Sequence, residues 1–337
     1  MTILITGGAG YIGAHVNKWL HEHGYGTVVI DNLSRGHAEL VRWGKFVRGD
    51  IGVPRLLDDV FGLEKIDAVM HFAAYAYVGE SVTEPASYYE NNVAKTMVLL
   101  DAMRRHNVNH FVFSSTCATF GNANYTPIDE KHPQCPVNSY GQTKLVVERM
   151  LLDYERAYGL KHCVFRYFNA TGASLDAEIG EWHEPETHLI PLVLDTAAGK
   201  REAIHVFGTD YPTADGTCVR DYIHVCDLAE AHRLGMEHLL RHGKSEHFNL
   251  GCARGHSINE VIETARRITG KPIKVCYTDR REGDPPVLVG AYRKAQEILQ
   301  WSPLYSLEES IESAWKWHEQ ERNRQIVKPI GKRAKAA

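Results

Sequence analysis

Residues 1–13, MTILITGGAGYIG, predict how the first strand and helix of this chain are built. Ile3, Leu4 and Ile5 form an apolar run that is too short for a helix and ends at glycine, as a buried parallel strand does. Gly7 permits a tight turn, Gly10 lets the backbone approach a pyrophosphate, and Gly13 lets the next helix pack closely on the strand. The first turn of that helix then directs N–H groups at the phosphates.

The second strand adds the context that a glycine triplet lacks, since glycines alone also suit any strand-to-helix corner. Residues 27–30 form this strand, and Asp31 follows it, about 20 residues beyond the glycine motif, where a carboxylate binds the adenosine ribose hydroxyls. Asp31 would repel a 2′-phosphate, so we expect NAD rather than NADP. Arg35 is the only nearby feature that argues for NADP.

Composition limits the class of protein. The chain has 337 residues, 44% of them hydrophobic, which predicts one large or two fused globular domains. A formal charge of -4 gives no case for nucleic acid, and the basic end, residues 328–337, is expected to be a solvated terminus. Because Met1 leads almost directly into a core strand and no apolar run reaches membrane-spanning length, we expect no signal sequence and no membrane.

The cysteines and histidines indicate the compartment and exclude one kind of site. Seven scattered cysteines without a C-x-x-C pair are typical of reduced thiols in the cytoplasm. The nineteen histidines show no metal-ligand spacing, so no metal is expected.

The next segments continue a strand-and-helix alternation, which predicts an α/β fold with a Rossmann-type doubly wound parallel sheet. Further strands are expected at 46–47, 68–72, 110–114 and 162–166. A helix is expected over 85–105, with a core stripe of Val93, Met97, Leu100 and Met103. Asp50, at the end of the third strand, either caps the next segment or binds the adenine amino group. The small residues Ala73 and Ala74 would let the cofactor lie close at the switch point.

Residues 136–150, PVNSYGQTKLVVERM, carry the candidate chemistry. Tyr140 and Lys144 are four residues apart and therefore share one helix face. An ammonium beside a phenol favours the phenolate, which can deprotonate an alcohol. On its own this pair would be an exposed tyrosine and lysine. Next to a hydride acceptor and the Thr116 hydroxyl it predicts an alcohol oxidation site.

Beyond Gly172 the alternation fades, which predicts a smaller second domain. We expect an NAD-binding domain over 1–170, a substrate domain over 171–330 that interleaves with it, and a basic tail over 331–337. Second-domain helices are expected at 189–198, 226–240, 257–269 and 307–321, with short strands at 248–250 and 273–277. Ser257 and Glu260 form a capping box at one helix start.

Motifs spread over nearly the whole chain resemble those of the extended short-chain dehydrogenases and, within them, the UDP-hexose 4-epimerases. The matching runs are TGGAGYIG (6–13), DNLS (31–34), GDI (49–51), HFAA (71–74), VGESV (78–82), FSSTCATFG (113–121), SYGQTK (139–144), RYFNATGA (166–173), FGTDYPTADGTCVRDYIHV (207–225), FNLG (248–251) and RREGD (280–284). The ADGTCVRDYIHV run and the later RREGD are the most specific.

The resemblance implies two sets of binding residues. The cofactor set for NAD is Gly7, Gly10, Tyr11, Ile12, Gly13, Asp31, Asn32, Asp50, Ile51, Phe72, Ala73, Ala74, Asn91, Ser114, Tyr140, Lys144 and Tyr167. The UDP-sugar set is Thr116, Phe168, Asn169, His188, Leu189, Phe207, Arg220, Arg281 and Asp284. Arginine suits phosphate oxygens, aspartate suits ribose hydroxyls, and an aromatic ring suits uracil.

The implied activity interconverts UDP-glucose and UDP-galactose through a 4-keto sugar. Tyr140 takes the proton of the 4-hydroxyl as its hydride passes to NAD, Lys144 holds the ribose and lowers the pKa of Tyr140, and Thr116 binds the reacting oxygen. The sugar turns over while UDP stays anchored, and the hydride returns to the other face. The family also implies a homodimer formed through helices of the first domain.

Departures from related enzymes narrow this interpretation and leave alternatives open. Dehydratases and decarboxylases that resemble this chain typically carry glutamate just after the Thr116 position, where this chain has Cys117 and Ala118, which favours epimerisation. Ala76 and Leu288 differ from some hexose epimerases, and Leu288 leaves N-acetylated substrates undecided. Two runs also resemble UDP-xylose/UDP-arabinose 4-epimerases, so pentose or dual specificity stays open. The alternative from another class is a non-catalytic NAD-binding sensor.

Overall fold

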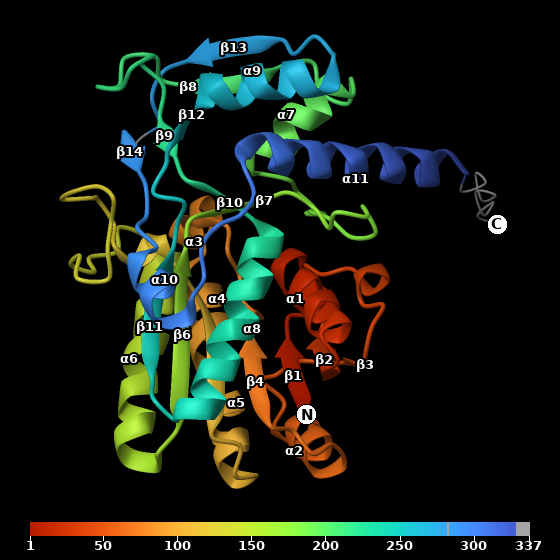
Figure 1. Ribbon diagram of the computed structural model, residues 1–337, viewed down its shortest axis with the longest axis vertical. Coiled ribbons are helices and arrows are strands. Elements are labelled where there is room, and N and C mark those ends of the chain that lie inside the picture. Colours follow the sequence, from red (N-terminus) through yellow and green to blue (C-terminus); the bar gives the residue numbers. More distant parts are fainter. Residues whose placement is uncertain (282, 328–337) are drawn as a thin grey trace.

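The computed structural model describes residues 1–281 and 283–327, so the expected tail at 331–337 lies outside the described residues. Seven parallel strands form the main sheet in the order β11-β6-β5-β4-β1-β2-β3 (Figure 1). Their bounds are Thr2–Thr6 (β1), Gly26–Asp31 (β2), Lys45–Arg48 (β3), Ala68–His71 (β4), His110–Thr116 (β5), Lys161–Tyr167 (β6) and Glu246–Leu250 (β11). The strand order reverses between β1 and β4, as the Rossmann-type prediction requires, and this is where such sheets bind dinucleotides.

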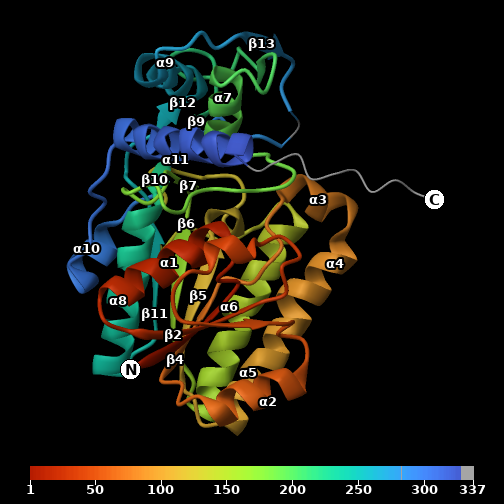
Figure 2. The same cartoon turned by 90° about the vertical axis from the view of Figure 1, so that its right-hand side faces the viewer.

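Helices cover both faces of the sheet because the strands are apolar on both sides. On one face α1 (Tyr11–Glu22) packs against α8 (Val225–His242), with α10 (Arg293–Leu299) beside them. On the other lie α2 (Pro54–Leu63), α5 (Lys95–Arg105) and α6 (Ser139–Tyr158) (Figure 2). An apolar core lies between the sheet and the helices on each face. These helices leave uncovered the edge formed by the carboxyl ends of the strands, which we call the binding edge.

The helix expected over residues 85–105 is broken. The structure has α3 (Val78–Thr83), α4 (Pro85–Tyr89), a π-helical turn at Glu90–Ala94 and then α5. The wider turn shifts which side chains face the core: Leu99, Leu100 and Met103 are fully buried. The prediction that Met97 is a core residue is therefore wrong, because this side chain is 47% exposed.

A second lobe lies beyond the binding edge (Figure 1). It contains α7 (Leu189–Ala197), α9 (Ile258–Thr269) and α11 (Leu307–Val327), which enclose a separate core. Its small sheets join β7 (Asn169–Thr171) to β10 (Tyr222–His224), β8 (Ile204–Phe207) to β13 (Val275–Thr278), and β9 (Val219–Arg220) to β12 (His256–Ser257) and β14 (Val287–Leu288).

The chain passes between the lobes more than once. Two elements that were expected in the second domain belong to the first lobe. Residues 226–240 lie in α8, which packs on the main sheet, and residues 248–250 lie in β11, which pairs with β6. All seven cysteines are free thiols. Within residues 1–281 and 283–327, no helix is both long and apolar enough to cross a membrane.

Candidate active site

The turn between β1 and α1 is shaped for a phosphate group. Gly7 has φ +76°, and a Cβ there would overlap the backbone of Ala73 after β4. A Cβ on Gly13 would overlap the Gly7 carbonyl. At Gly10, by contrast, a Cβ would have one neighbour within 4 Å, the Gly7 carbonyl oxygen at 3.4 Å. The space in front of Gly10 is open at the N-terminus of α1, and this cradle fits the pyrophosphate of NAD.

Asp31, at the end of β2, has a structural role that the sequence did not reveal. Its carboxylate accepts hydrogen bonds from the backbone N–H groups of Ala9 (3.0 Å) and Leu33 (2.8 Å). It therefore fastens the glycine turn to the loop after β2, and its remaining lone pairs can accept from ribose hydroxyls. Burial raises the pKa of Asp31.

Asp50, which is expected at the adenine, joins a polar group with Asn32 of the cofactor set and with Lys95, which was not predicted. Asn32 Nδ2 and Lys95 Nζ both donate to Asp50 Oδ2, at 2.8 and 2.7 Å, and Ile51 is buried beside them. The Arg35 guanidinium, the one feature that argued for NADP, is 2.5 Å from Glu80 and lies over the Tyr77 ring. Because Arg35 is paired with a carboxylate, the local charges fit NAD.

The π-helical turn brings an unpredicted residue to the cofactor edge. Asn92 is buried, and its amide accepts from the Tyr75 N–H (2.8 Å) and donates to the Tyr75 carbonyl (2.9 Å), which fixes the chain after β4. The expected residue, Asn91, donates to Asn92 Oδ1. Phe72, Ala73 and Ala74 follow β4 directly, and Phe72 donates its N–H to the Thr6 carbonyl. Two consecutive asparagines within an apolar helical pattern were the sequence signal that could have indicated this contact.

The proposed catalytic side chains converge at the carboxyl end of β5. Asn138 caps α6 by accepting from the Gly141 N–H (2.8 Å), and a Cβ on Gly141 would overlap the Ala118 carbonyl. This close approach places Tyr140 against Thr116, whose side chain lowers the pKa of the Tyr140 hydroxyl. Lys144 Nζ donates to the Ser114 carbonyl (2.7 Å). The Ser114 hydroxyl is hydrogen-bonded to the Tyr167 hydroxyl, which completes the group.

Burial dominates the electrostatics of this group. Burial raises the pKa of Tyr140 to about 12, against the opposing effect of the Thr116 side chain. Burial also lowers the pKa of Lys144 to about 7, although the Glu148 carboxylate one turn further on opposes this. Burial of the phenol therefore opposes the phenolate that Lys144 is expected to favour, and the lowering of the pKa of Tyr140 by Lys144 stays a prediction.

The second lobe faces this group with two arginines. Arg220 on β9 lies 3.8 Å from Asp284 and donates to the Pro285 carbonyl (2.8 Å). Arg281 pairs with Asp284 at 3.0 Å, and its guanidinium lies over the Phe207 ring. Arg220 is close enough to the Cys117 thiol, next to Thr116, to oppose the rise that burial causes in the pKa of that thiol. The structure therefore brings these four expected substrate residues together, opposite the catalytic group.

Other expected substrate residues are placed differently. Asn169 Nδ2 donates to the Asp221 carbonyl (2.9 Å), and Leu189 begins α7. Phe168 is buried beside Leu288. Its ring packs so closely on Gly290 that a Cβ there would overlap it. His188 is turned toward two carboxylates, with its Nδ1 2.9 Å from oxygens of Glu181 and Glu186. This arrangement was not predicted.

Asp221 is a second residue that sequence reasoning missed. It is fully buried, and its carboxylate accepts from the backbone N–H groups of Cys252 (2.9 Å) and Gly290 (3.0 Å). It thus joins three distant segments behind Arg220. Burial raises the pKa of Asp221 to about 6.

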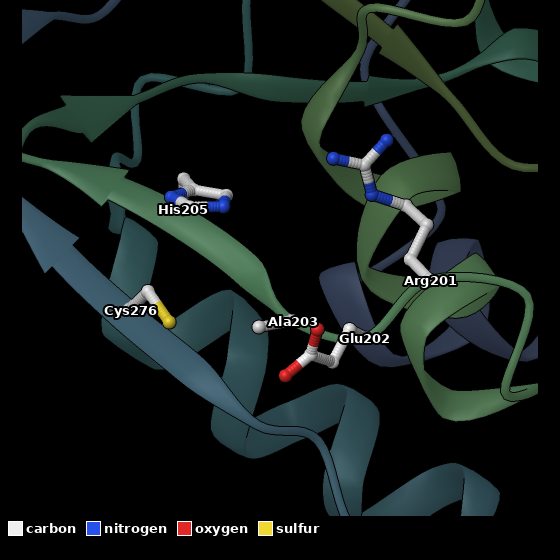
Figure 3. A pocket seen from close by; sticks show the side chains of 5 residues that line it. All are labelled: Arg201, Glu202, Ala203, His205 and Cys276. Atoms are coloured by element: carbon white, nitrogen blue, oxygen red, sulfur yellow. The ribbon is translucent and has the colours of Figure 1, made fainter.

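A cavity of about 340 Å³ lies away from all these residues, on the outer β8–β13 sheet (Figure 3). It is lined by Arg201, Glu202, Ala203, His205 and Cys276. None of them belongs to the predicted cofactor or substrate sets.

Comparison with known proteins gives concordant results. A family model described as the NAD dependent epimerase/dehydratase family matches residues 3–251. A UDP-glucose 4-epimerase of Rhizobium leguminosarum bv. trifolii is 51% identical over 94% of this chain and 97% of that protein.

Two solved structures are also similar. The UDP-glucose 4-epimerase of Brucella ovis, in complex with NAD, is 49% identical with a TM-score of 0.92, covering 94% of this chain and 97% of that one. The UDP-glucose 4-epimerase of Stenotrophomonas maltophila, with NAD and formylated UDP-arabinopyranose, is 37% identical with a TM-score of 0.94, covering 96% and 99%.

Proposed function

The chain belongs to the NAD dependent epimerase/dehydratase family, and on that premise we propose that it is an NAD-dependent isomerase, a UDP-glucose 4-epimerase that interconverts UDP-glucose and UDP-galactose. One observation carries the proposal. Tyr140 and Thr116 lie together at the carboxyl end of β5, at the same edge of the sheet as the glycine turn, and Arg220 of the second lobe is close enough to lower the pKa of the neighbouring Cys117 thiol. Nearly complete coverage of relatives at about half identity supports it.

The proton chemistry follows from the geometry. Tyr140 is the base for the sugar 4-hydroxyl, and Thr116 binds the same oxygen, so both act where negative charge develops. NAD, when bound, would supply the hydride acceptor, and its oxidised nicotinamide ring would place a positive charge beside the phenol until the hydride arrives. Lys144, with a pKa of about 7, adds a second positive charge when protonated, and its hydrogen bond to the Ser114 carbonyl keeps its ammonium near the ribose position.

The second lobe is the proposed anchor. Arg220 and Arg281 suit the diphosphate, and Phe207 suits the uracil ring. Asp284, already paired with both arginines, can accept from the uridine ribose. Asn169 and Leu189 complete the proposed nucleotide site. An anchor fixed at the nucleotide leaves the sugar free to present its other face to the cofactor.

Cys117 argues against elimination chemistry. Burial raises the pKa of the Cys117 thiol to about 12, so it stays neutral and is a poor substitute for the carboxylic acid that a dehydratase needs. Ala118 has no proton to donate. Tyr140→Phe tests the assigned base, because a phenyl ring cannot accept the proton.

The experiment that tests the function incubates the purified protein and NAD with UDP-galactose and measures UDP-glucose. We expect conversion in both directions with no net consumption of NAD. No conversion, while NAD remains bound, would support the alternative of an NAD-binding sensor.

Pentose specificity is the second candidate function, because the similar Stenotrophomonas maltophila structure is described with formylated UDP-arabinopyranose. A parallel assay with UDP-galactose, UDP-arabinopyranose and UDP-N-acetylgalactosamine ranks the substrates. Equal turnover of the first two would establish dual specificity. Turnover of the third would show that Leu288 tolerates the acetamido group.

We propose that the protein is a cytoplasmic homodimer. Large apolar side chains are exposed on helices of the first lobe, with Tyr89 and Met97 on α4 and α5, and Leu152 and Tyr158 on α6. Such side chains suit a subunit contact. Light scattering at the mass of a monomer would contradict the dimer. The seven free thiols suit a reducing compartment, and cell fractionation tests it.

A further inference from the structure

Residues 172–188, which we call the strap, connect β7 to α7. They belong to the second lobe in sequence but run between α11 and α1 (Figure 1). A Cβ on Gly180 would overlap the Trp317 ring of α11, so the strap packs tightly on that side. Its other side contacts the segments that follow β1, β2 and β4, which border the expected NAD site.

The first anchor of the strap is α1, the helix after the glycine turn. Lys18 Nζ is hydrogen-bonded to Asp176 and Glu178 of the strap, and the Lys18 side chain is 8% exposed. The Tyr11 hydroxyl donates to the Gly172 carbonyl at 2.6 Å. The helix that binds the pyrophosphate therefore also holds the start of the strap.

Two further anchors lie on opposite sides of the cofactor site. The Trp182 ring stacks on His37, in the loop after β2, with centroids 3.8 Å apart and planes 6° from parallel. The Tyr77 hydroxyl, in the loop after β4, donates to the Pro185 carbonyl at 3.0 Å. Since β2 and β4 flank β1, the strap bridges the two sides of the crevice above the glycine turn.

Around these two anchors the strap carries two glutamates and two histidines that face one another, Glu181, His183, Glu186 and His188. One imidazole nitrogen of each histidine and one carboxylate oxygen of each glutamate all lie within 4.8 Å of one another. His188 Nδ1 is 2.9 Å from Glu181 and Glu186, and His183 Nδ1 is 3.2 Å from Glu181. The His183 ring meets the Tyr11 ring edge-on at 6.3 Å, so this cluster lies over the phosphate turn.

The charges of the cluster balance when both imidazoles are protonated. Burial opposes this, but Glu181 and Glu186 outweigh it and raise the pKa of His183 to about 9 and that of His188 to about 10. Glu186 also accepts from the backbone N–H groups of Thr187 and His188, which fixes the end of the strap. The cluster is therefore a closed set of ion pairs within one short segment.

We infer that Glu181, His183, Glu186 and His188 are positioning residues that hold the strap across the cofactor crevice and so slow the release of NAD. The inference rests on the proposed function, because it requires NAD as the cofactor. An enzyme that regenerates its NAD in every cycle has no need to exchange it. A dinucleotide lying under the strap can leave only after the anchors on one side have opened.

The test measures the release of NAD from the holoenzyme. Wild type, Glu181→Gln, Tyr77→Phe and the control Glu263→Gln are loaded with NAD, passed through a desalting column and sampled over time for protein-bound NAD. Glu263 lies on α9 with an exposed side chain, so its change matches the chemistry of Glu181→Gln far from the strap.

We expect Glu181→Gln to release NAD at least about tenfold faster, as for loss of one charge-assisted hydrogen bond. The kcat at saturating NAD stays within about twofold of wild type. Tyr77→Phe removes one anchor without touching the cluster, gives a smaller acceleration and carries the test should Glu181→Gln fail to fold.

Release rates equal to that of Glu263→Gln in both variants would overturn the inference. So would about one equivalent of bound metal in the purified wild type, because protonated imidazoles cannot be metal ligands. A wild type that binds no NAD at all would instead contradict the proposed function.

Discussion

Replacing Gly10 by alanine separates binding of the cofactor from stability of the fold. The new methyl group has one neighbour, the Gly7 carbonyl oxygen at 3.4 Å, and otherwise projects into the open cradle. The change at a helix N-cap costs about 1 kcal/mol, which lowers Tm by only a few degrees. The methyl group, however, keeps a phosphate away from the first turn of α1. Losing two charge-assisted hydrogen bonds, at roughly 1.5–3 kcal/mol each, raises the Kd for NAD by at least about 100-fold.

Two matched variants show whether the cradle itself is responsible. Gly7→Ala places a side chain at φ +76° against the Ala73 backbone, so it should lower Tm far more than Gly10→Ala does. In Gly62→Ala on α2 the new methyl group meets no atom within 4 Å, so this variant should lower neither Tm nor the affinity for NAD. Isothermal titration calorimetry measures the Kd for NAD, and thermal melting of the apo forms measures Tm. Gly10→Ala with wild-type NAD affinity would refute the phosphate cradle.

Three further predictions concern the reacting group, the anchor and the buried carboxyl. Tyr140→Phe should lower kcat by about 10²–10⁴-fold, the usual contribution of a general base, with NAD binding retained; a coupled assay for UDP-glucose measures it, and unchanged turnover would exclude Tyr140 as the base. Arg220→Gln should raise KM for UDP-galactose at least about tenfold while NAD affinity stays constant, because Arg220 belongs to the second lobe; an unchanged KM in initial-rate measurements would remove it from the anchor. Burial raises the pKa of Asp221 from 3.8 to about 6, so stability from this carboxyl is full below pH 3.8 and is lost as pH rises through 6. Between pH 5 and pH 7 the urea-unfolding free energy of wild type should therefore fall by about 1 kcal/mol relative to Asp221→Asn, and parallel pH profiles for the two would contradict this.

The first lobe could be predicted from the sequence because its signals are local. The glycines, the Asp31 spacing and the apolar strands each act within about 30 residues, and the strands pair in parallel as expected. Tyr140 and Lys144 share a helix face by spacing alone. The π-helical turn was missed because Asn92 stabilises it through Tyr75, a contact that the periodicity of a helix does not encode.

The second lobe was less predictable because its contacts join distant residues. Asp221 binds N–H groups 31 and 69 residues further along the chain, and no local pattern announces such partners. The strap likewise depends on Lys18 and Tyr77, each more than 100 residues away. The net rise in the pKa of Tyr140 was not predictable for a related reason: it depends on burial, which the spacing of two residues does not determine.

The double duty of Asp31 limits how this protein can be redesigned. Exchanging an aspartate at this position for a smaller or basic residue is an obvious way to make an enzyme accept a 2′-phosphorylated dinucleotide. Here the same carboxylate fastens the Ala9 and Leu33 amides, so the exchange would also unfasten the turn on which either dinucleotide depends. Keeping Asp31 and releasing Arg35 by replacing Glu80 would not solve the problem either, because Asp31 would still repel the 2′-phosphate and the hydroxyl of buried Tyr88 would lose its hydrogen bond to Glu80.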